Sequence, residues 1–102
     1  MIRSLFLTFI NLCFLFAQND TLGVVKGQLI DMDSQLPLEG ANISIKSTIF
    51  GTISDEGGFF TIEEIPNGNY TIIFSYIGYK TEYLVDVWVR PHAYDFLNLQ
   101  LE

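Results

Sequence analysis

The sequence predicts a small all-β protein, a seven-stranded antiparallel β-sandwich of the Greek-key type. Three observations lead to this prediction. Apolar and polar residues alternate along most of the chain after residue 20, turn-forming segments recur about every 8 to 12 residues, and no later stretch has helical periodicity. The 102 residues have room for one domain, and a hydrophobic content of 49% is enough for a packed core.

The first segment of the chain has the pattern of a secretory signal peptide. One basic residue, Arg3, precedes the apolar run Leu5–Phe16, which is too short to cross a bilayer. We therefore predict a signal-peptide helix over residues 1–17, a linker over 18–22 and a folded domain over 23–102. A membrane anchor or a buried helix is the alternative.

Removal of this segment changes both the cysteine count and the charge. Cys13 is the single cysteine and lies inside it, so the mature chain has no thiol for a disulfide or a metal. Lipid attachment is a weaker alternative, because Leu12 is not the small residue that precedes a lipidated cysteine. The full chain has a net charge of −7, and loss of Arg3 leaves 4 basic and 12 acidic residues, a net charge of −8. Such a chain repels phosphate backbones, so a nucleic-acid partner is excluded.

The alternation of apolar and polar residues predicts six long strands, each with one buried and one solvent-exposed face. A seventh, short strand is expected at Thr52–Ser54. The turns between the strands are read from DMDSQLPLEG, DEGG, IPNGN, IGYK and RPHAY. The residues predicted to face the core are Val25, Gly27 and Leu29; Ala41, Ile43 and Ile45; Phe60 and Ile62; Tyr70, Ile72 and Phe74; Tyr83, Val85, Val87 and Val89; and Leu97, Leu99 and Leu101.

The most acidic of these turns is SDEGGFF, residues 54–60. Asp55, at the first turn position, can accept hydrogen bonds from backbone N–H groups further along the chain. Gly57 and Gly58 can supply the positive φ that closes a hairpin. We therefore predict a hairpin tip.

Calcium binding is the weaker interpretation of the acidic residues, and we expect no resident cofactor. Loops between antiparallel strands alternate between the two ends of a sandwich, so those at 31–39, 55–58 and 78–80 are expected at one end. The weak calcium candidates brought together there are Asp31, Asp33, Asp55 and Glu56. Calcium prefers six to eight oxygen ligands, and the spacing of these residues matches no EF-hand.

The sequence predicts no catalytic site. His92 is the single histidine, and RPHAY has the composition of an exposed turn rather than of a cleft. A hydrolase with paired carboxylates also needs a cleft around its acids, which hairpin tips on so small a domain seldom form.

Three apolar residues on predicted wet faces are candidates for partner binding. They are Ile73, Leu84 and Trp88, and they would form an exposed patch if the fifth and sixth strands are adjacent. The alternative is that they are scattered surface residues or are covered by the tail of the chain.

Five segments in order over residues 24–102 resemble a known family. They are VKGQLID, PLEGANISIKST, GTISDEGGFFTI, IPNGNYTIIFSYIGYKT and FLNLQLE. Together they resemble the carboxypeptidase regulatory-like domain, a transthyretin-like β-sandwich that is not known to be an enzyme. In bacteria such domains often stand at the N-terminus of TonB-dependent outer-membrane receptors, including SusC-like glycan importers.

The resemblance assigns structural roles to the matching residues. Gly27 would let the first strand pass close to a neighbour, and Phe60 would plug the core. The full set is Gly27, Pro37, Leu38, Gly40, Ala41, Asp55, Gly58, Phe60, Gly68, Tyr70, Gly78 and Tyr79.

The resemblance also implies a function and a location. We expect an exported accessory or interaction domain in the periplasm or outer membrane of a Gram-negative bacterium. It would belong to a TonB-dependent receptor that takes up nutrients, with a receptor plug, barrel or envelope protein as partner. Membrane attachment would come only through the signal peptide or a C-terminal barrel. The alternative is a free-standing secreted or surface module that binds carbohydrate or calcium.

Overall fold

The computed structural model describes residues 21–102 of the chain. The predicted signal peptide lies outside the described residues, as does most of the predicted linker. The first strand begins at Leu22, the last residue of that linker, one residue before the predicted domain. No helix in the described part is long and apolar enough to cross a membrane.

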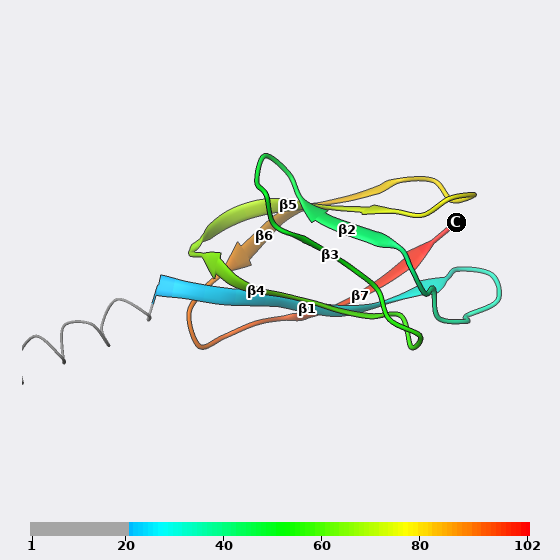
Figure 1. Ribbon diagram of the computed structural model, residues 1–102, viewed down its shortest axis with the longest axis horizontal. Helices are drawn as coiled ribbons and strands as arrows, with labels where there is room; N and C mark the ends of the chain where they lie inside the picture. Colours follow the sequence, from blue (N-terminus) through cyan, green and yellow to red (C-terminus); the bar gives the residue numbers. More distant parts are fainter. Residues whose placement is uncertain (1–20) are drawn as a thin grey trace, which may run out of the picture.

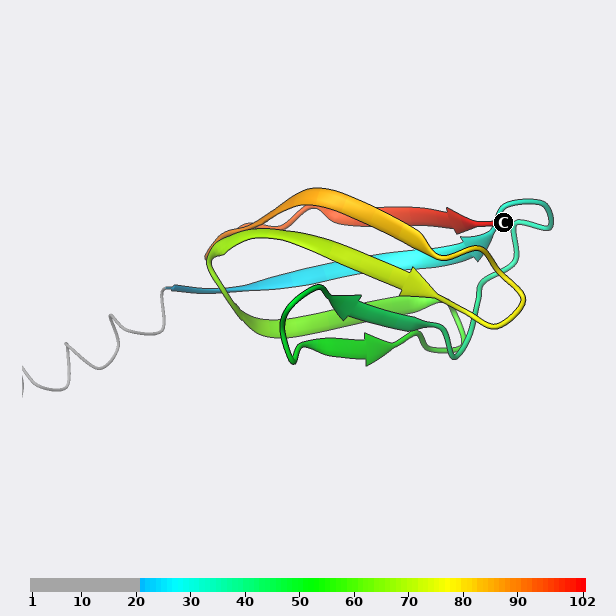
Figure 2. The ribbon, with the colours of Figure 1, turned by 90° about the horizontal axis from the view of Figure 1, so that it is seen from above.

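Seven strands form two sheets that pack face to face as a β-sandwich, as predicted (Figure 1 and Figure 2). The strands are β1 (Leu22–Asp31), β2 (Asn42–Ile45), β3 (Gly51–Ile53), β4 (Phe59–Pro66), β5 (Gly68–Ser75), β6 (Glu82–Val89) and β7 (Phe96–Leu101). One sheet has the strand order β4-β1-β7 and the other has the order β3-β2-β5-β6.

One pairing differs from the all-antiparallel prediction. β7 runs parallel to β1, with Lys26 opposite Phe96 and Asp31 opposite Leu101. The chain crosses from β6 in one sheet to β7 in the other after a turn at residues 90–93, so β7 is not the second arm of a hairpin. Alternation along a strand assigns its faces but not its direction, which is why the sequence did not distinguish the two arrangements.

The core lies between the sheets and is built from the inward side of the alternating strands. Phe60 of β4 and Phe74 of β5 meet edge to face across it, with their ring centroids 5.6 Å apart. Its buried hydrophobic residues are Val25, Leu29, Leu38, Ala41, Ile43, Ile45, Phe60, Ile62, Ile65, Ile72, Phe74, Val89 and Leu101. Residues 21–102 contain no cysteine, and burial of apolar area holds the sandwich together.

Two β-bulges change which residues face the core. Glu64 in β4 and Asp86 in β6 both have a φ of 57°, and each lies where the register of its strand pair shifts. An extra residue in one strand of a pair reverses the alternation beyond it. In β4 the bulge lets both Ile62 and Ile65 point into the core although they are three positions apart.

In β6 the bulge makes part of the predicted inward and outward assignment of side chains wrong. Tyr83 and Val85 are 57% and 61% exposed, so the prediction that they face the core is wrong. Leu84, predicted to face solvent, instead packs against the core. Beyond the bulge the prediction holds, because Val89 is buried and Val87 packs against the core.

Gly27 lies where β1 passes closest to its neighbours. A Cβ atom at this position would stand 2.5 Å from the Phe60 ring and would overlap the carbonyl oxygen of Leu97 in β7. No side chain larger than hydrogen fits there without moving a strand. This close approach agrees with the role that the resemblance implies for Gly27.

Candidate functional site

The loop after β1 is organised around Asp31. Its Oδ1 accepts hydrogen bonds from the backbone N–H groups of Asp33 and Ser34, both at 2.8 Å. Its Oδ2 accepts a hydrogen bond of 2.6 Å from the hydroxyl of Tyr79, in the loop between β5 and β6. The Tyr79 hydrogen bond, and then the Ser34 N–H, lower the pKa of Asp31 below its ordinary value of 3.8. The same contact with Asp31 raises the pKa of Tyr79 above its ordinary value of 10.0.

Asp55 closes the hairpin between β3 and β4, as predicted. Its Oδ1 accepts hydrogen bonds from the N–H groups of Gly57 at 3.0 Å and Phe59 at 2.9 Å. The N–H of Gly58 donates to the Asp55 carbonyl oxygen at 2.9 Å, and Gly58 has the expected positive φ of 77°. The side chain is thus part of the turn itself.

The four acidic calcium candidates are not assembled into a metal site. The Asp31 and Asp55 loops do lie at the same end of the sandwich, since Gly58 packs against Pro37 and Leu38. Within residues 21–102, however, no group of three or more His, Cys, Asp or Glu side chains is placed to hold a metal ion. Asp31 and Asp55 use carboxylate oxygens for turn hydrogen bonds instead. Calcium binding therefore has no geometric support in this part of the chain.

Ser54 is a structural residue that the sequence did not single out. It is 3% exposed, donates a 2.6 Å hydrogen bond to the Leu38 carbonyl oxygen, and accepts one of 3.0 Å from the Ala41 N–H. These bonds hold the turn into β2 against the end of β3. Pro37, at the start of the same turn, forms an isolated bridge with Ile30. A serine at a strand end carries no sequence signal that separates it from a solvent-exposed one.

The remaining motif residues belong to turns and strand ends. Gly40 and Gly78 have φ values of 84° and 87°, which L side chains rarely adopt. Gly68 begins β5, and the Tyr70 hydroxyl donates a 2.6 Å hydrogen bond to the Pro66 carbonyl oxygen. These contacts link β4 to β5 at the end of the sandwich opposite Asp31.

The predicted apolar patch is not formed as a unit. β5 and β6 are adjacent, as the patch requires, but Leu84 is turned inward against the core. Ile73 lies opposite Tyr83 and is half-buried, whereas Trp88 is 61% exposed. Partner binding by Ile73 and Trp88 stays a prediction. The exposed apolar side chains of β6 are Tyr83, Val85 and Trp88.

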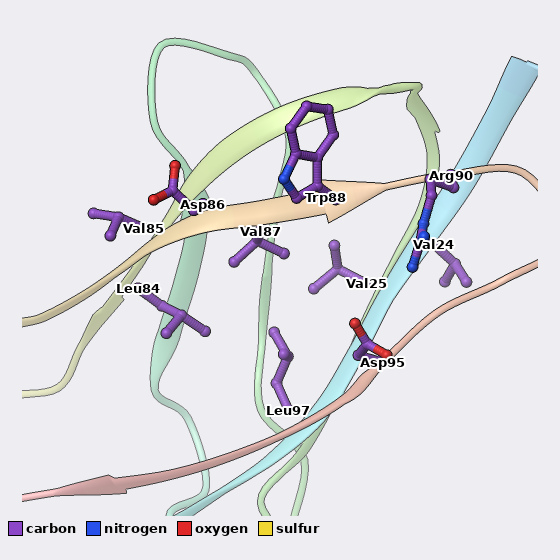
Figure 3. Close-up of a pocket in the computed structure, with 10 residues that line it drawn as sticks. All are labelled: Val24, Val25, Leu84, Val85, Asp86, Val87, Trp88, Arg90, Asp95 and Leu97. Carbon is purple, nitrogen blue, oxygen red and sulfur yellow. The ribbon is translucent and has the colours of Figure 1, made fainter.

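A groove opens along the seam between β6 and β7, the edge strands of the two sheets. Its cavity of about 300 Å³ has an apolar floor formed by Val25, Leu84, Val87 and Leu97. Figure 3 shows Leu84 and Val87 on the side of β6 that faces Val25 and Leu97, with Trp88 on the opposite side. The lining also includes the charged residues Asp86, Arg90 and Asp95.

A second cavity of about 670 Å³ lies beside the first, over the start of β1. Lys26, Arg90, His92 and Tyr94 line it, together with Glu63 and other residues of β1 and β4. The Nζ atom of Lys26 lies 5.1 Å from the centre of the Tyr94 ring. His92 is exposed and lies in a turn, as predicted, with a φ of 60°.

The outer face of the three-stranded sheet also exposes aromatic rings. Phe59 and Phe96 are each 47% exposed and meet edge to face, with ring centroids 6.4 Å apart. Sequence reasoning missed this pair, although alternation places Phe59 opposite to the buried Phe60. Exposed aromatic side chains on a small acidic domain are typical of a binding surface.

Comparisons with known proteins agree with this architecture. The family model described as the CarboxypepD_reg-like domain matches residues 25–97. TonB-dependent receptor P39 of Formosa agariphila is 32% identical over 66 residues, which cover 65% of this chain and 6% of the receptor. TonB-dependent receptor P3 of the same organism is 36% identical over 58 residues, which cover 57% of this chain and 6% of the receptor. The similarity thus spans a small part of each receptor.

The fold also resembles chains in two crystal structures of mutant type II cohesin-X-dockerin complexes from Acetivibrio cellulolyticus. The TM-scores are 0.62 and 0.64 at 23% sequence identity, and the match covers 76% of this chain and 52% of the other. At this identity the likeness shows a shared fold alone.

Proposed function

Because the chain belongs to the CarboxypepD_reg-like domain family, we propose that it is an exported, non-catalytic interaction domain of a TonB-dependent outer-membrane receptor. It lies on the periplasmic side and contributes to nutrient uptake, for example of a glycan, by contacting the receptor plug or an envelope protein. The observation that carries the proposal is the similarity to two TonB-dependent receptors.

The site geometry supports a binding role. Asp31 and Asp55 act in turns, and His92 lies on an exposed turn. What the domain offers to a partner is a groove with an apolar floor and several exposed aromatic rings. Such features are typical of contact surfaces.

The test is an in-frame deletion of residues 23–102 from the gene in its natural context. We expect the receptor that lacks these residues to reach the outer-membrane fraction but to support slower TonB-dependent uptake than the intact receptor. An antibody against the domain should detect it in the same fraction. Detection only in the cytosol, or unchanged uptake after deletion, would overturn the proposal.

A carbohydrate-binding module is the second candidate, and the cavity beside Tyr94 is the observation that favours it. The cavity combines an aromatic ring with charged side chains, including Lys26, Arg90 and Glu63. A ligand that binds only the folded state raises its melting temperature. A rise with a given oligosaccharide that Tyr94→Ala abolishes would favour this candidate.

A further inference from the structure

β7 differs from the other three edge strands of the sandwich. An unpaired strand edge is a template for pairing with another chain, and proteins usually protect it with bulges or short strands. β3 has only three residues, and β4 and β6 carry the bulges at Glu64 and Asp86. β7 has six residues that pair with β1 in unbroken register, and among residues 21–102 no strand pairs with its other side, which is called the free edge below.

The backbone orientation of β7 follows from its hydrogen bonds. The Leu101 carbonyl oxygen accepts the Met32 N–H at 2.9 Å, on the β1 side. Backbone groups of successive residues in a strand point to opposite sides, so those of Asn98 point to the free edge. The Glu102 carbonyl oxygen agrees with this alternation, because it accepts the Lys80 N–H at 2.7 Å from the loop before β6.

This free edge adjoins the groove with the apolar floor. The Lys80–Glu102 hydrogen bond connects the end of β7 to the start of β6. The cavity lies at the other end of the seam between these two strands, where Trp88 and Asp95 border it. Figure 3 shows Leu97 of β7 and Val87 of β6 facing each other across it. An extended segment alongside β7 would hydrogen-bond to the free edge and place alternate side chains in the groove.

Charge identifies the kind of segment. The protein has a net charge of −7, and Asp95 lines the groove beside one cation, Arg90, whereas the Asp86 carboxylate lies on the outer side of β6 (Figure 3) and accepts a 3.4 Å hydrogen bond from the Asn69 side-chain amide. A second copy of this chain would bring the same negative charge to the seam and be repelled. A basic segment is complementary.

We propose that the free edge of β7 and the adjoining groove bind a short, extended, basic segment of an envelope protein, with apolar side chains at alternate positions. This inference deepens the proposed function and rests on it only for the partner's place in the cell envelope. The binding is strand addition to β7, completed by apolar side chains in the groove.

Trp88 provides a fluorescent reporter, because it is the single tryptophan and belongs to β6, the strand that borders the groove, although its ring lies on the outer side of that strand (Figure 3). The probe is a synthetic peptide of alternating valine and lysine, about as long as β7. We expect Trp88 fluorescence to change saturably as the peptide is added. Binding should be weaker at high salt, because screening reduces the attraction between the basic peptide and the acidic protein. A peptide with glutamate in place of lysine should not bind.

Asn98→Pro tests the strand addition. It removes an N–H on the free edge and leaves the β1–β7 ladder intact, an arrangement that edge strands tolerate. We expect about tenfold weaker binding than to the wild type, since one or two hydrogen bonds are lost. Asn98→Ala is the matched control and should bind as tightly as the wild type.

A peptide N-methylated at alternate residues tests the same bonds without changing the protein, in case Asn98→Pro unfolds. Equal affinity for the methylated and unmethylated peptides, or equal binding of the glutamate peptide, would overturn the inference. A dimer of the purified chain that the lysine peptide does not dissociate would identify a second copy as the occupant and would also overturn it. None of these outcomes changes the uptake assay, so failure of this inference and failure of the proposed function are distinguishable.

Discussion

Gly27→Ala adds a single methyl group at the point where β1, β7 and the core meet. The new Cβ would overlap the Leu97 carbonyl oxygen and stand 2.5 Å from the Phe60 ring. The carbonyl belongs to the β1–β7 ladder, and Phe60 is held against Phe74 on the other sheet. Neither neighbour is the flexible end of an exposed side chain, so relief requires the strands to move.

The expected cost can be worked from these contacts. Inserting a methyl group into a packed core costs about 1–3 kcal/mol, and contact with backbone favours the upper end. Alanine regains about 0.5–1 kcal/mol because it loses less backbone entropy than glycine in a strand. The net loss is therefore about 2 kcal/mol, which lowers the melting temperature of a domain this size by about 8–16 °C.

Two other glycines separate the steric cause from backbone conformation. Gly40 has a φ of 84° but no atom within 4 Å of an added Cβ, so Gly40→Ala should cost only the conformational penalty of about 1–2 kcal/mol. Gly58 has a φ of 77° and its added Cβ would overlap the Leu29 carbonyl oxygen, so Gly58→Ala should be the most destabilising.

Urea and thermal unfolding, followed by Trp88 fluorescence and far-ultraviolet circular dichroism, measure all three variants. The reasoning is refuted if Gly27→Ala unfolds at the wild-type temperature. It is also refuted if Gly40→Ala proves the least stable of the three.

Ser54→Ala should cost about 1–3 kcal/mol in urea unfolding, because two buried backbone groups lose their partner, whereas the exposed Ser44→Ala should stay within about 0.5 kcal/mol of wild type. Tyr79→Phe should lower the melting temperature most near neutral pH. Because the pKa of Asp31 is lowered in the folded protein, the hydrogen bond adds stability above pH 3.8, and this stability is lost as the pH falls through the pKa of the folded state. Because the pKa of Tyr79 is raised, the hydrogen bond adds stability below pH 10.0, and this stability is lost as the pH rises through the pKa of the folded state. The difference in melting temperature between the wild type and Tyr79→Phe should become smaller at both low and high pH, and a difference that stayed constant would contradict this explanation. Added calcium should leave the melting temperature unchanged, because Asp31 and Asp55 serve in turns; a rise that Asp55→Ala removed would restore the calcium interpretation.

Much of the fold could be predicted because a strand has a side-chain period of two. The inward faces of β1, β2, β5 and β7 follow directly from the alternation, and Val25, Ile43, Ile72 and Leu101 are buried as predicted. The hairpin tip at Asp55 was predictable for the same local reason, since an aspartate followed by glycines satisfies its own turn.

The bulges were not predictable in this way. Asp86 and Glu64 adopt a positive φ that neither residue type requires, and only the fit of β6 on β5 and of β4 on β1 selects it. The bulge in β6 moved Leu84 from the predicted surface patch into the groove and moved Val85 out of the core. One extra residue in a ladder thus reassigned one candidate site residue and one predicted core residue.

The sequence by itself determined the elements of this protein: seven strands, the inward residues of most of them, the turns between them, the acidic charge and the resemblance to a domain family. These properties depend on neighbours within a few residues along the chain. Only the tertiary structure decided the parallel place of β7 beside β1, the two bulges and the groove at the free edge. Each of these depends on contacts between strands far apart in sequence, whose register is set by packing the two sheets together.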